Sequence, residues 1–286
     1  MQTEQLATEP DLSARVTDVL PTNTGQFWGG RWHTHRNAEH LRSINPSTGQ
    51  LLGDVQVARL VDIEAAVASA RQAFPGWAAT PPLERARCLR EAATRIRANA
   101  LELALLDAAD CGNPVRAMVM DAEIAATQLE YFAGLVLEIK GETMPTANGS
   151  LNYTRREPLG VVARIFPFNH PFMFAAGKIA APLAAGNTVI IKPPEQAPLS
   201  TLRLMELLQD IFPPGVLNCL VGGRDVGAAL VKHPEVAAVG LIGSVPAGKA
   251  VLHSAADTMK RCLLELGGKN AMVIYPDADI DCAVQG

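Results

Sequence analysis

Residues 159–195 read LGVVARIFPFNHPFMFAAGKIAAPLAAGNTVIIKPPE, and this stretch decides the fold. The apolar run over 161–166 predicts a buried strand, and the apolar residues within 172–183 predict a helix after it. A second apolar strand is expected at 189–191. Strand, helix and strand in this order are typical of a right-handed crossover between two parallel strands.

The same alternation of short apolar strands and amphipathic helices continues beyond this unit. The further strands are expected at 216–221, 236–242, 263–264 and 271–274. The further helices are expected at 199–211, 226–231 and 247–256. The pattern predicts the α/β class, with a Rossmann-like parallel sheet and flanking helices.

The first half of the chain is expected to be mainly helical after two initial strands. Residues 1–24 are polar and are predicted to be a flexible N-terminus. The strands are expected at 26–32 and 51–57, and the helices at 63–74, from just after Pro82 to 109, and at 118–139. Pro75 and Gly76 are expected to end the first helix. Residues 140–158 alternate weakly and are predicted to form an extended arm or hairpin.

The composition excludes several classes of function. Of 286 residues, 48% are apolar and 19% charged, which is typical of a soluble globular protein. The net charge is −4 and no Lys/Arg stripe marks a nucleic-acid partner. No run approaches the roughly 20 apolar residues of a membrane span. The five cysteines form no CxxC pair, so free thiols, no metal site and a cytoplasmic protein are expected.

Lys192 and Glu195 come directly after the second strand of the opening stretch. Ligands of parallel sheets bind beyond the carboxyl ends of the strands, where an acidic side chain accepts hydrogen bonds from ribose hydroxyls. A solvated ion pair is an equally good interpretation of these two residues alone. A carboxylate here would repel a 2′-phosphate, which favours NAD, although the nearby lysine leaves NADP as an alternative.

Gly243 and Ser244 end one expected strand and begin the next helix. A glycine lets phosphate approach the backbone, and a helix N-terminus offers free N–H groups. Ser244 as a simple N-cap is the alternative. Residues 243–249 also fit the pattern G-x-x-x-x-G-K, but Ala250 stands where a P-loop needs Ser or Thr for Mg²⁺. We therefore reject a nucleotide triphosphatase.

Two further polar residues follow strands. The Asn169 amide could donate to a developing oxyanion, although asparagine is also common in turns. Glu265 ends an apolar strand before two glycines and could act as a general base, although a salt-bridging role is commoner for a single carboxylate. The first strand–helix turn lacks the G-x-G-x-x-G fingerprint of conventional dinucleotide folds.

Taken together, these segments resemble the aldehyde dehydrogenase superfamily, from about Phe27 to the last residue. The similar segments follow in the family's order: Phe168-Asn169-His170-Pro171, residues 186–199, Pro213-Pro214-Gly215-Val216-Leu217-Asn218, Gly243-Ser244, and Leu264-Glu265-Leu266-Gly267-Gly268-Lys269. Phe168 stands where the family usually has Trp, and Ile242 where it has Thr. These departures suggest altered packing near the nicotinamide and acyl groups.

The resemblance implies roles and a domain plan. It implies catalytic roles for Asn169 (oxyanion amide), Glu265 (base that activates water) and Lys178 (a supporting lysine). It implies cofactor binding by Ile165, Lys192, Glu195, Gly243, Ser244, Leu266 and Gly267. It divides the chain into an NAD-binding domain (25–139 and 159–269), a bridging and oligomerisation arm (140–158) and the start of an incomplete catalytic domain (270–286).

The implied reaction is NAD-dependent oxidation of a small aldehyde to a carboxylic acid through a thiohemiacetal and a thioester. The family's nucleophilic cysteine follows Glu265 in a Gly-Gln-x-Cys-like segment that this sequence does not contain, and we assign neither Cys262 nor Cys282 to that role. The chain is thus expected to be the cofactor-binding part of a protein that forms homodimers or homotetramers at full length. If Gly286 is the natural end, the alternative is an inactive NAD-binding or oligomer-forming protein.

Overall fold

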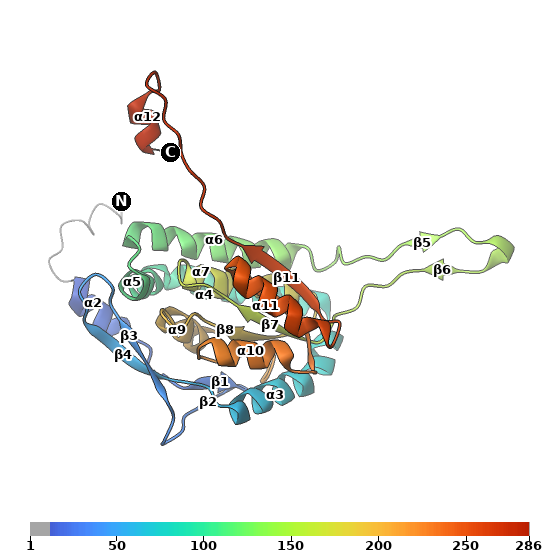
Figure 1. Ribbon diagram of the computed structural model, residues 1–286. Helices are drawn as coiled ribbons and strands as arrows, with labels where there is room; N and C mark the ends of the chain where they lie inside the picture. Colours follow the sequence, from blue (N-terminus) through green and yellow to red (C-terminus); the bar gives the residue numbers. More distant parts are fainter. Residues whose placement is uncertain (1–11, 286) are drawn as a thin grey trace.

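A seven-stranded sheet forms the centre of the computed structural model, which describes residues 12–285 (Figure 1). Its strand order is β11-β10-β7-β8-β9-β1-β2. The strands are β1 (Gln26–Trp28), β2 (Arg31–His33), β7 (Val161–Ile165), β8 (Thr188–Lys192), β9 (Leu217–Cys219), β10 (Val236–Gly243) and β11 (Arg261–Leu266). The five strands from β11 to β9 are parallel, and β1 and β2 extend the sheet in antiparallel pairing.

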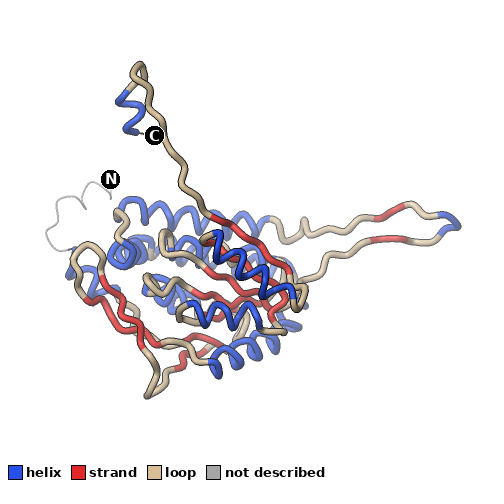
Figure 2. Tube along the Cα trace, in the orientation of Figure 1, coloured by secondary structure: helices blue, strands red, loops and turns tan. Residues whose placement is uncertain are grey.

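Helices cover both faces of this sheet, as Figure 2 shows. One apolar core lies between the sheet and α3 (Leu60–Ala79), α10 (Arg224–Lys232) and α11 (Val245–Ala256). The other core lies under α4 (Pro82–Ala98), α5 (Ala100–Cys111), α6 (Val115–Gly134), α7 (Pro171–Gly177), α8 (Ala180–Ala184) and α9 (Leu199–Leu208). Strands buried on both faces read as continuous apolar runs, which is why 161–166 and 189–191 are recognisable in the sequence.

Two short hairpins and three further helical segments complete the described chain. The hairpins pair β3 (His40–Ile44) with β4 (Leu51–Gln56), and β5 (Thr143–Met144) with β6 (Asn152–Tyr153). The second hairpin lies within the predicted arm, carries the 3-10 turn η1 (Ala147–Gly149) at its tip and projects far from the body in Figure 1. Helix α2 (Leu12–Val19) packs against α5, so residues 12–19 are ordered where a flexible segment was expected. Residues 1–11 of that expected segment lie outside the described residues.

Helix α3 does not end at Pro75, contrary to the sequence expectation, but runs on to Ala79. Pro75 removes one backbone donor, yet the following turn is held by tertiary contacts. Trp77 is buried, its Nε1 donates to the Leu183 carbonyl at 3.2 Å, and its ring packs edge-on against Phe212. Burial of a large aromatic side chain outweighs the local loss.

The single helix expected over 172–183 is split into α7 and α8. Pro182 has no N–H to donate to the Lys178 carbonyl four residues earlier, so the helix cannot continue through that turn. The break lies at Lys178 and Ile179. It leaves the Lys178 side chain at a corner rather than on a regular helix.

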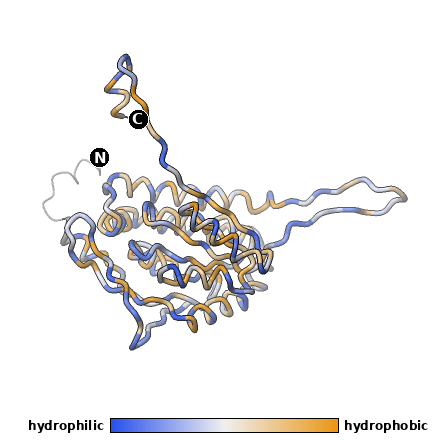
Figure 3. The backbone as a smooth tube through the Cα atoms, viewed as in Figure 1, coloured by the Kyte–Doolittle hydropathy of each residue, from blue (hydrophilic) through white to orange (hydrophobic). Residues whose placement is uncertain are grey.

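The strand expected at 271–274 does not form. Beyond β11 the chain leaves the sheet and ends in α12 (Ile280–Gln285), as Figure 1 shows. Met272, Val273 and Ile274 are exposed there, and the hydropathy colouring of Figure 3 shows apolar residues in this departing segment. The apolar run satisfies the local pattern of a strand, but no described strand lies beside it to complete a ladder.

Candidate active site

The order of the parallel strands reverses beside β7. β8 and β9 follow β7 on one side, whereas β10 and β11 lie on its other side. Such a switch opens a crevice at the carboxyl ends of the strands, which is where ligands of open α/β sheets bind. The candidate site residues Ile165, Lys192 and Gly243 are the last residues of β7, β8 and β10.

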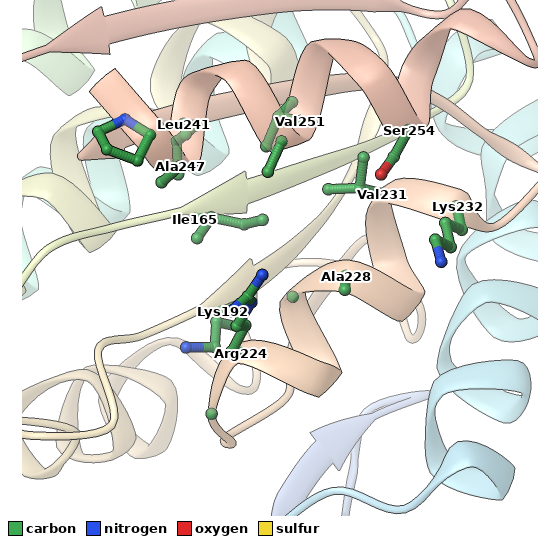
Figure 4. A pocket seen from close by; sticks show the side chains of 14 residues that line it. Ile165, Lys192, Arg224, Ala228, Val231, Lys232, Leu241, Ala247, Val251 and Ser254 are labelled. Atoms are coloured by element: carbon green, nitrogen blue, oxygen red, sulfur yellow. The ribbon is translucent and has the colours of Figure 1, made fainter. Parts of the chain in front are cut away.

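A cavity of about 560 Å³ lies at this crevice between α10 and α11 (Figure 4). Small side chains face it from both helices and leave the space open. The residues that line it are Ile165, Lys192, Gly223, Arg224, Gly227, Ala228, Val231, Lys232, Leu241, Pro246, Ala247, Ala250, Val251 and Ser254. Its volume and its mainly apolar wall with a few polar groups suit a small ligand or part of a dinucleotide.

Lys192 and Glu195 form an ion pair at the edge of this cavity, with Nζ and Oε2 3.7 Å apart. Burial of Lys192 lowers the pKa of its ammonium group, and the Glu195 carboxylate opposes that shift. Glu195 itself is half-exposed and lies against Gly223, where an added Cβ would come within 3.2 Å of Oε2. The pair is therefore fixed in the structure, and Gly223 leaves the carboxylate accessible.

Gly243 and Ser244 form the turn between β10 and α11. The Ser244 hydroxyl accepts a hydrogen bond from the Ala247 N–H at 3.3 Å, which makes Ser244 the N-cap of α11. The Gly267 N–H donates to the Gly243 carbonyl at 3.0 Å, so the two glycine-containing turns are joined. Leu266 packs over Gly248 of α11, where a Cβ would meet its side chain at 2.7 Å.

The expected catalytic residues lie on the opposite face of the sheet. Lys178 Nζ donates to both carboxylate oxygens of Glu265, at 3.0 and 3.2 Å. Asn169 is exposed in the turn between β7 and α7, and its backbone carbonyl accepts a hydrogen bond from Asn113 Nδ2 at 2.5 Å. Within the described residues no hydrogen bond joins Asn169 to Lys178 or Glu265. The structure thus brings Lys178 and Glu265 together, and the Asn169 side-chain amide has no hydrogen-bond partner among residues 12–285.

The Aldehyde dehydrogenase family profile matches residues 32–286 of this sequence. The chain belongs to the aldehyde dehydrogenase family. This confirms the resemblance drawn from the ordered segments, and the parallel sheet confirms the predicted fold class.

Relatives and solved structures of this family cover nearly the whole chain. It is 50% identical to aldehyde dehydrogenase tropH of Talaromyces stipitatus over 94% of the chain and 53% of that relative. It is 41% identical to a betaine aldehyde dehydrogenase of Vibrio vulnificus over 91% of the chain and 54% of that relative. The chain therefore spans about half the length of these relatives.

Similar structures include complexes with the nicotinamide cofactor. PnpE from Pseudomonas sp. WBC-3 with nicotinamide adenine dinucleotide has a TM-score of 0.87 and 38% identity, covering 92% of this chain and 55% of that chain. Betaine aldehyde dehydrogenase from Staphylococcus aureus with NAD⁺ has a TM-score of 0.90 and 31% identity, covering 96% of this chain and 56% of that chain.

The cysteines of this aldehyde dehydrogenase chain are poorly suited to nucleophilic attack. Burial raises the pKa of Cys111 to about 11, and burial also raises the pKa of Cys88, Cys219 and Cys262. A thiol must ionise to act as a nucleophile, so these shifts disfavour the reactive form. Cys262 also packs with the α10–α11 core. Side chains alternate between the two faces of a strand, so Glu265, three residues later in β11, points to the opposite face of the sheet. Cys282 is exposed on α12, away from the sheet.

Some residues near the site were missed by the sequence reasoning. Arg224 and Lys232 line the cavity from α10. The small residues of α10 were a usable signal, because a helix that presents Gly227 and Ala228 beside a sheet leaves room for a ligand. Arg164 is buried on the face that carries Glu265, with its guanidinium in the space where Gly240 lacks a Cβ. No local pattern distinguishes such an arginine from a surface one.

Two further findings concern the described part of the chain. Residues 12–285 include no helix long and apolar enough to cross a membrane. The same residues include no group of three or more His, Cys, Asp or Glu side chains placed to hold a metal ion.

Proposed function

We propose that this chain is the NAD-binding part of an aldehyde dehydrogenase that oxidises a small aldehyde to a carboxylic acid. The observation that carries the proposal is the buried Lys192 paired with Glu195 beside a cavity at the strand switch. Both side chains present groups that can hydrogen-bond ribose hydroxyls, and Gly223 keeps the carboxylate accessible. Family membership over residues 32–286 supports it.

The residues around the cavity fit a dinucleotide. We propose that Lys192 and Glu195 hold the adenosine ribose, with Ile165 and the small residues of α10 and α11 beside the adenine. The N-terminus of α11 at Gly243 and Ser244 would face the pyrophosphate, since it offers free N–H groups and a favourable dipole. Leu266 and Gly267 would line the pyrophosphate end of the site, because Leu266 packs against α11 and the Gly267 N–H bonds to the Gly243 carbonyl. NAD, when bound, supplies the hydride acceptor.

We further propose how the residues on the other face contribute. The free Asn169 amide would donate to an oxyanion that develops on the aldehyde carbon's oxygen. Glu265 would take a proton from water during release of the acid, and Lys178 holds its carboxylate in place through both oxygens. We assign no cysteine of this chain as the nucleophile. Residues 270–286 are proposed to begin the catalytic domain, because their apolar side chains are exposed here.

Titration calorimetry of the chain with NAD⁺ and NADP⁺ tests the cofactor site. We expect NAD⁺ to bind more tightly than NADP⁺. Glu195→Gln and Lys192→Met should each weaken NAD⁺ binding by about three- to tenfold, because each removes about one hydrogen bond to the cofactor. Glu138→Gln, at an exposed carboxylate in the segment that follows α6, is the matched control and should leave binding unchanged. Unchanged affinity in both site variants would contradict the assignment.

Aldehyde-dependent formation of NADH tests turnover separately from binding. NAD⁺ binding without turnover would support a cofactor-binding role for this chain alone. Turnover by this chain that survives Glu265→Gln unchanged would contradict the proposed base.

A further inference from the structure

The junction of α5 and α6 contacts both loops that carry the proposed site. Asp107 Oδ2 accepts the Phe172 N–H at 3.2 Å, at the start of α7. Asp110 Oδ2 accepts the Leu199 N–H at 2.9 Å, at the start of α9. Helix α7 begins two residues after Asn169, and α9 begins four residues after Glu195. One helix, α5, therefore supplies an acceptor to the segment that follows each loop.

The same junction also holds the Asn169 turn from its other side. Asn113, in the link between α5 and α6, donates to the Asn169 carbonyl at 2.5 Å. Asp121 of α6 is hydrogen-bonded to His170, with Oδ2 and Nδ1 2.6 Å apart. The chain is thus held at Asn169 and in the residues that follow it, while the Asn169 side-chain amide stays exposed.

Burying these carboxyl groups costs desolvation free energy, which their hydrogen bonds must offset. Asp107, Asp110 and Asp121 are 0%, 3% and 4% exposed. Burial raises the pKa of Asp107 to about 8 and that of Asp110 to about 7. The Ser200 hydroxyl faces Asp107 but falls short of hydrogen-bond geometry, which leaves Oδ1 without a partner in the described chain. An apolar side chain would avoid this desolvation cost, but it would leave the first N–H groups of α7 and α9 unsatisfied.

We propose that Asp107, Asp110, Asn113 and Asp121 form a shared positioning corner, which fixes the Asn169 amide and the Lys192–Glu195 pair relative to one another. None of these four residues is a proposed contact of NAD or of the aldehyde. They act through the two loops that carry those contacts. The inference rests on the proposed function for the roles of those loops. Its physical basis is that α5 and α6 pack together as one unit. Because this unit bonds to the starts of both α7 and α9, a shift of one start relative to the other would strain these hydrogen bonds.

NAD⁺ affinity tests the Asp110 arm of the corner. Asp110→Ala removes the acceptor for Leu199, and we expect NAD⁺ to bind about three- to tenfold more weakly. Asp110→Asn keeps one carbonyl oxygen for that N–H, so it should restore affinity to within about twofold of the parent chain. Leu103→Ala, a cavity variant in the same helix, should lower Tm without changing the affinity of the folded protein.

Amide hydrogen exchange tests the corner without relying on cofactor binding. Asp110→Ala should speed exchange at residues 196–200 and also at 169–173, whereas Leu103→Ala at equal loss of Tm should not single out these segments. Asn113→Ala, a change at a half-exposed position that leaves the core intact, should speed exchange at 169–173 alone.

The outcomes separate this inference from the proposed function. If the parent chain binds no NAD⁺, the proposed function fails while the exchange experiment still decides the corner. If NAD⁺ binds but Asp110→Ala leaves both affinity and exchange at 169–173 unchanged, the corner is overturned and the cofactor site stands.

Discussion

Asp62, Asp107 and Asp110 are all nearly inaccessible to solvent, yet their environments shift the pKa in opposite directions. For Asp62, burial raises the pKa, but hydrogen bonds from the Arg59 N–H and from His35 outweigh it and the net pKa is lowered. For Asp107 and Asp110, burial is the largest effect and the few donors present do not offset it. Asp62 has more donors, two of them on side chains that can carry positive charge, and it lies less deep in the protein than Asp107 and Asp110.

The raised pKa values predict that stability falls as pH rises. A carboxyl with a folded pKa of about 7 or 8, against 3.8 for the ordinary group, binds more protons when folded, so its contribution is lost as pH rises through the folded value. Asp110, Asp121 and Cys111 are the titratable groups that face Asp107. We expect Asp107→Asn to raise Tm by a few degrees at about pH 9 and to change it little at about pH 4, close to the ordinary pKa of the group.

Thermal unfolding by circular dichroism across this pH range measures the effect. Asp54→Asn, at an exposed position in β4, is the control and should give a curve parallel to that of the parent chain. A pH dependence of Tm that is identical in Asp107→Asn and the parent chain would contradict the raised pKa.

The helices show how tertiary contacts override local signals. Helix α3 continues through Pro75 and Gly76, because Trp77 is anchored in the core. Helix α5 ends at Gly112, which adopts φ +83°. Glycine is a common helix-stop residue at both positions, but only Gly112 adopts the left-handed conformation that glycine permits.

Substituting these two glycines by alanine should have opposite effects on stability. At Gly76 a Cβ meets nothing within 4 Å, so Gly76→Ala should stabilise the protein by roughly 0.5–1 kcal/mol through helix propensity. At Gly112 a Cβ would be strained by φ and would meet Pro46 at 3.0 Å, so Gly112→Ala should destabilise it by about 1–3 kcal/mol. Urea unfolding compares the two, and effects of the same sign would contradict this account.

At the scale of the whole molecule, the β5–β6 hairpin is a surface without a partner in the described chain. It projects from the body, and Leu151 and Tyr153 are 74% and 62% exposed (Figure 1). An isolated two-stranded hairpin is marginally stable in water, so an extended arm of this kind gains most from packing against another subunit. We propose, as the family resemblance implies, that residues 140–158 serve in oligomerisation, and these exposed apolar side chains support it.

Placing charge on this arm should weaken self-association. We expect the parent chain to form an oligomer and the double variant Leu151→Asp, Tyr153→Asp to shift to a smaller species in light scattering coupled to gel filtration, because a buried carboxylate is costly. Leu83→Asp, at a comparably exposed apolar position on α4, should leave the mass unchanged. A monomeric parent chain, or an unchanged mass in the double variant, would contradict the role of the arm.

Local periodicity was sufficient for the α/β class and for most elements after residue 159, because the patterns of buried strands and amphipathic helices lie in neighbouring residues. It also placed Lys192, Glu195 and Glu265 at strand ends. The family followed from the order of the similar segments. Only the tertiary structure decided that α3 passes Pro75, that 271–274 forms no strand, and that Lys178 meets Glu265. These depend on packing and strand pairing between distant residues. The buried acids of the α5–α6 junction belong to the same class, since a carboxyl's neighbours in space determine whether it is solvated, paired or protonated.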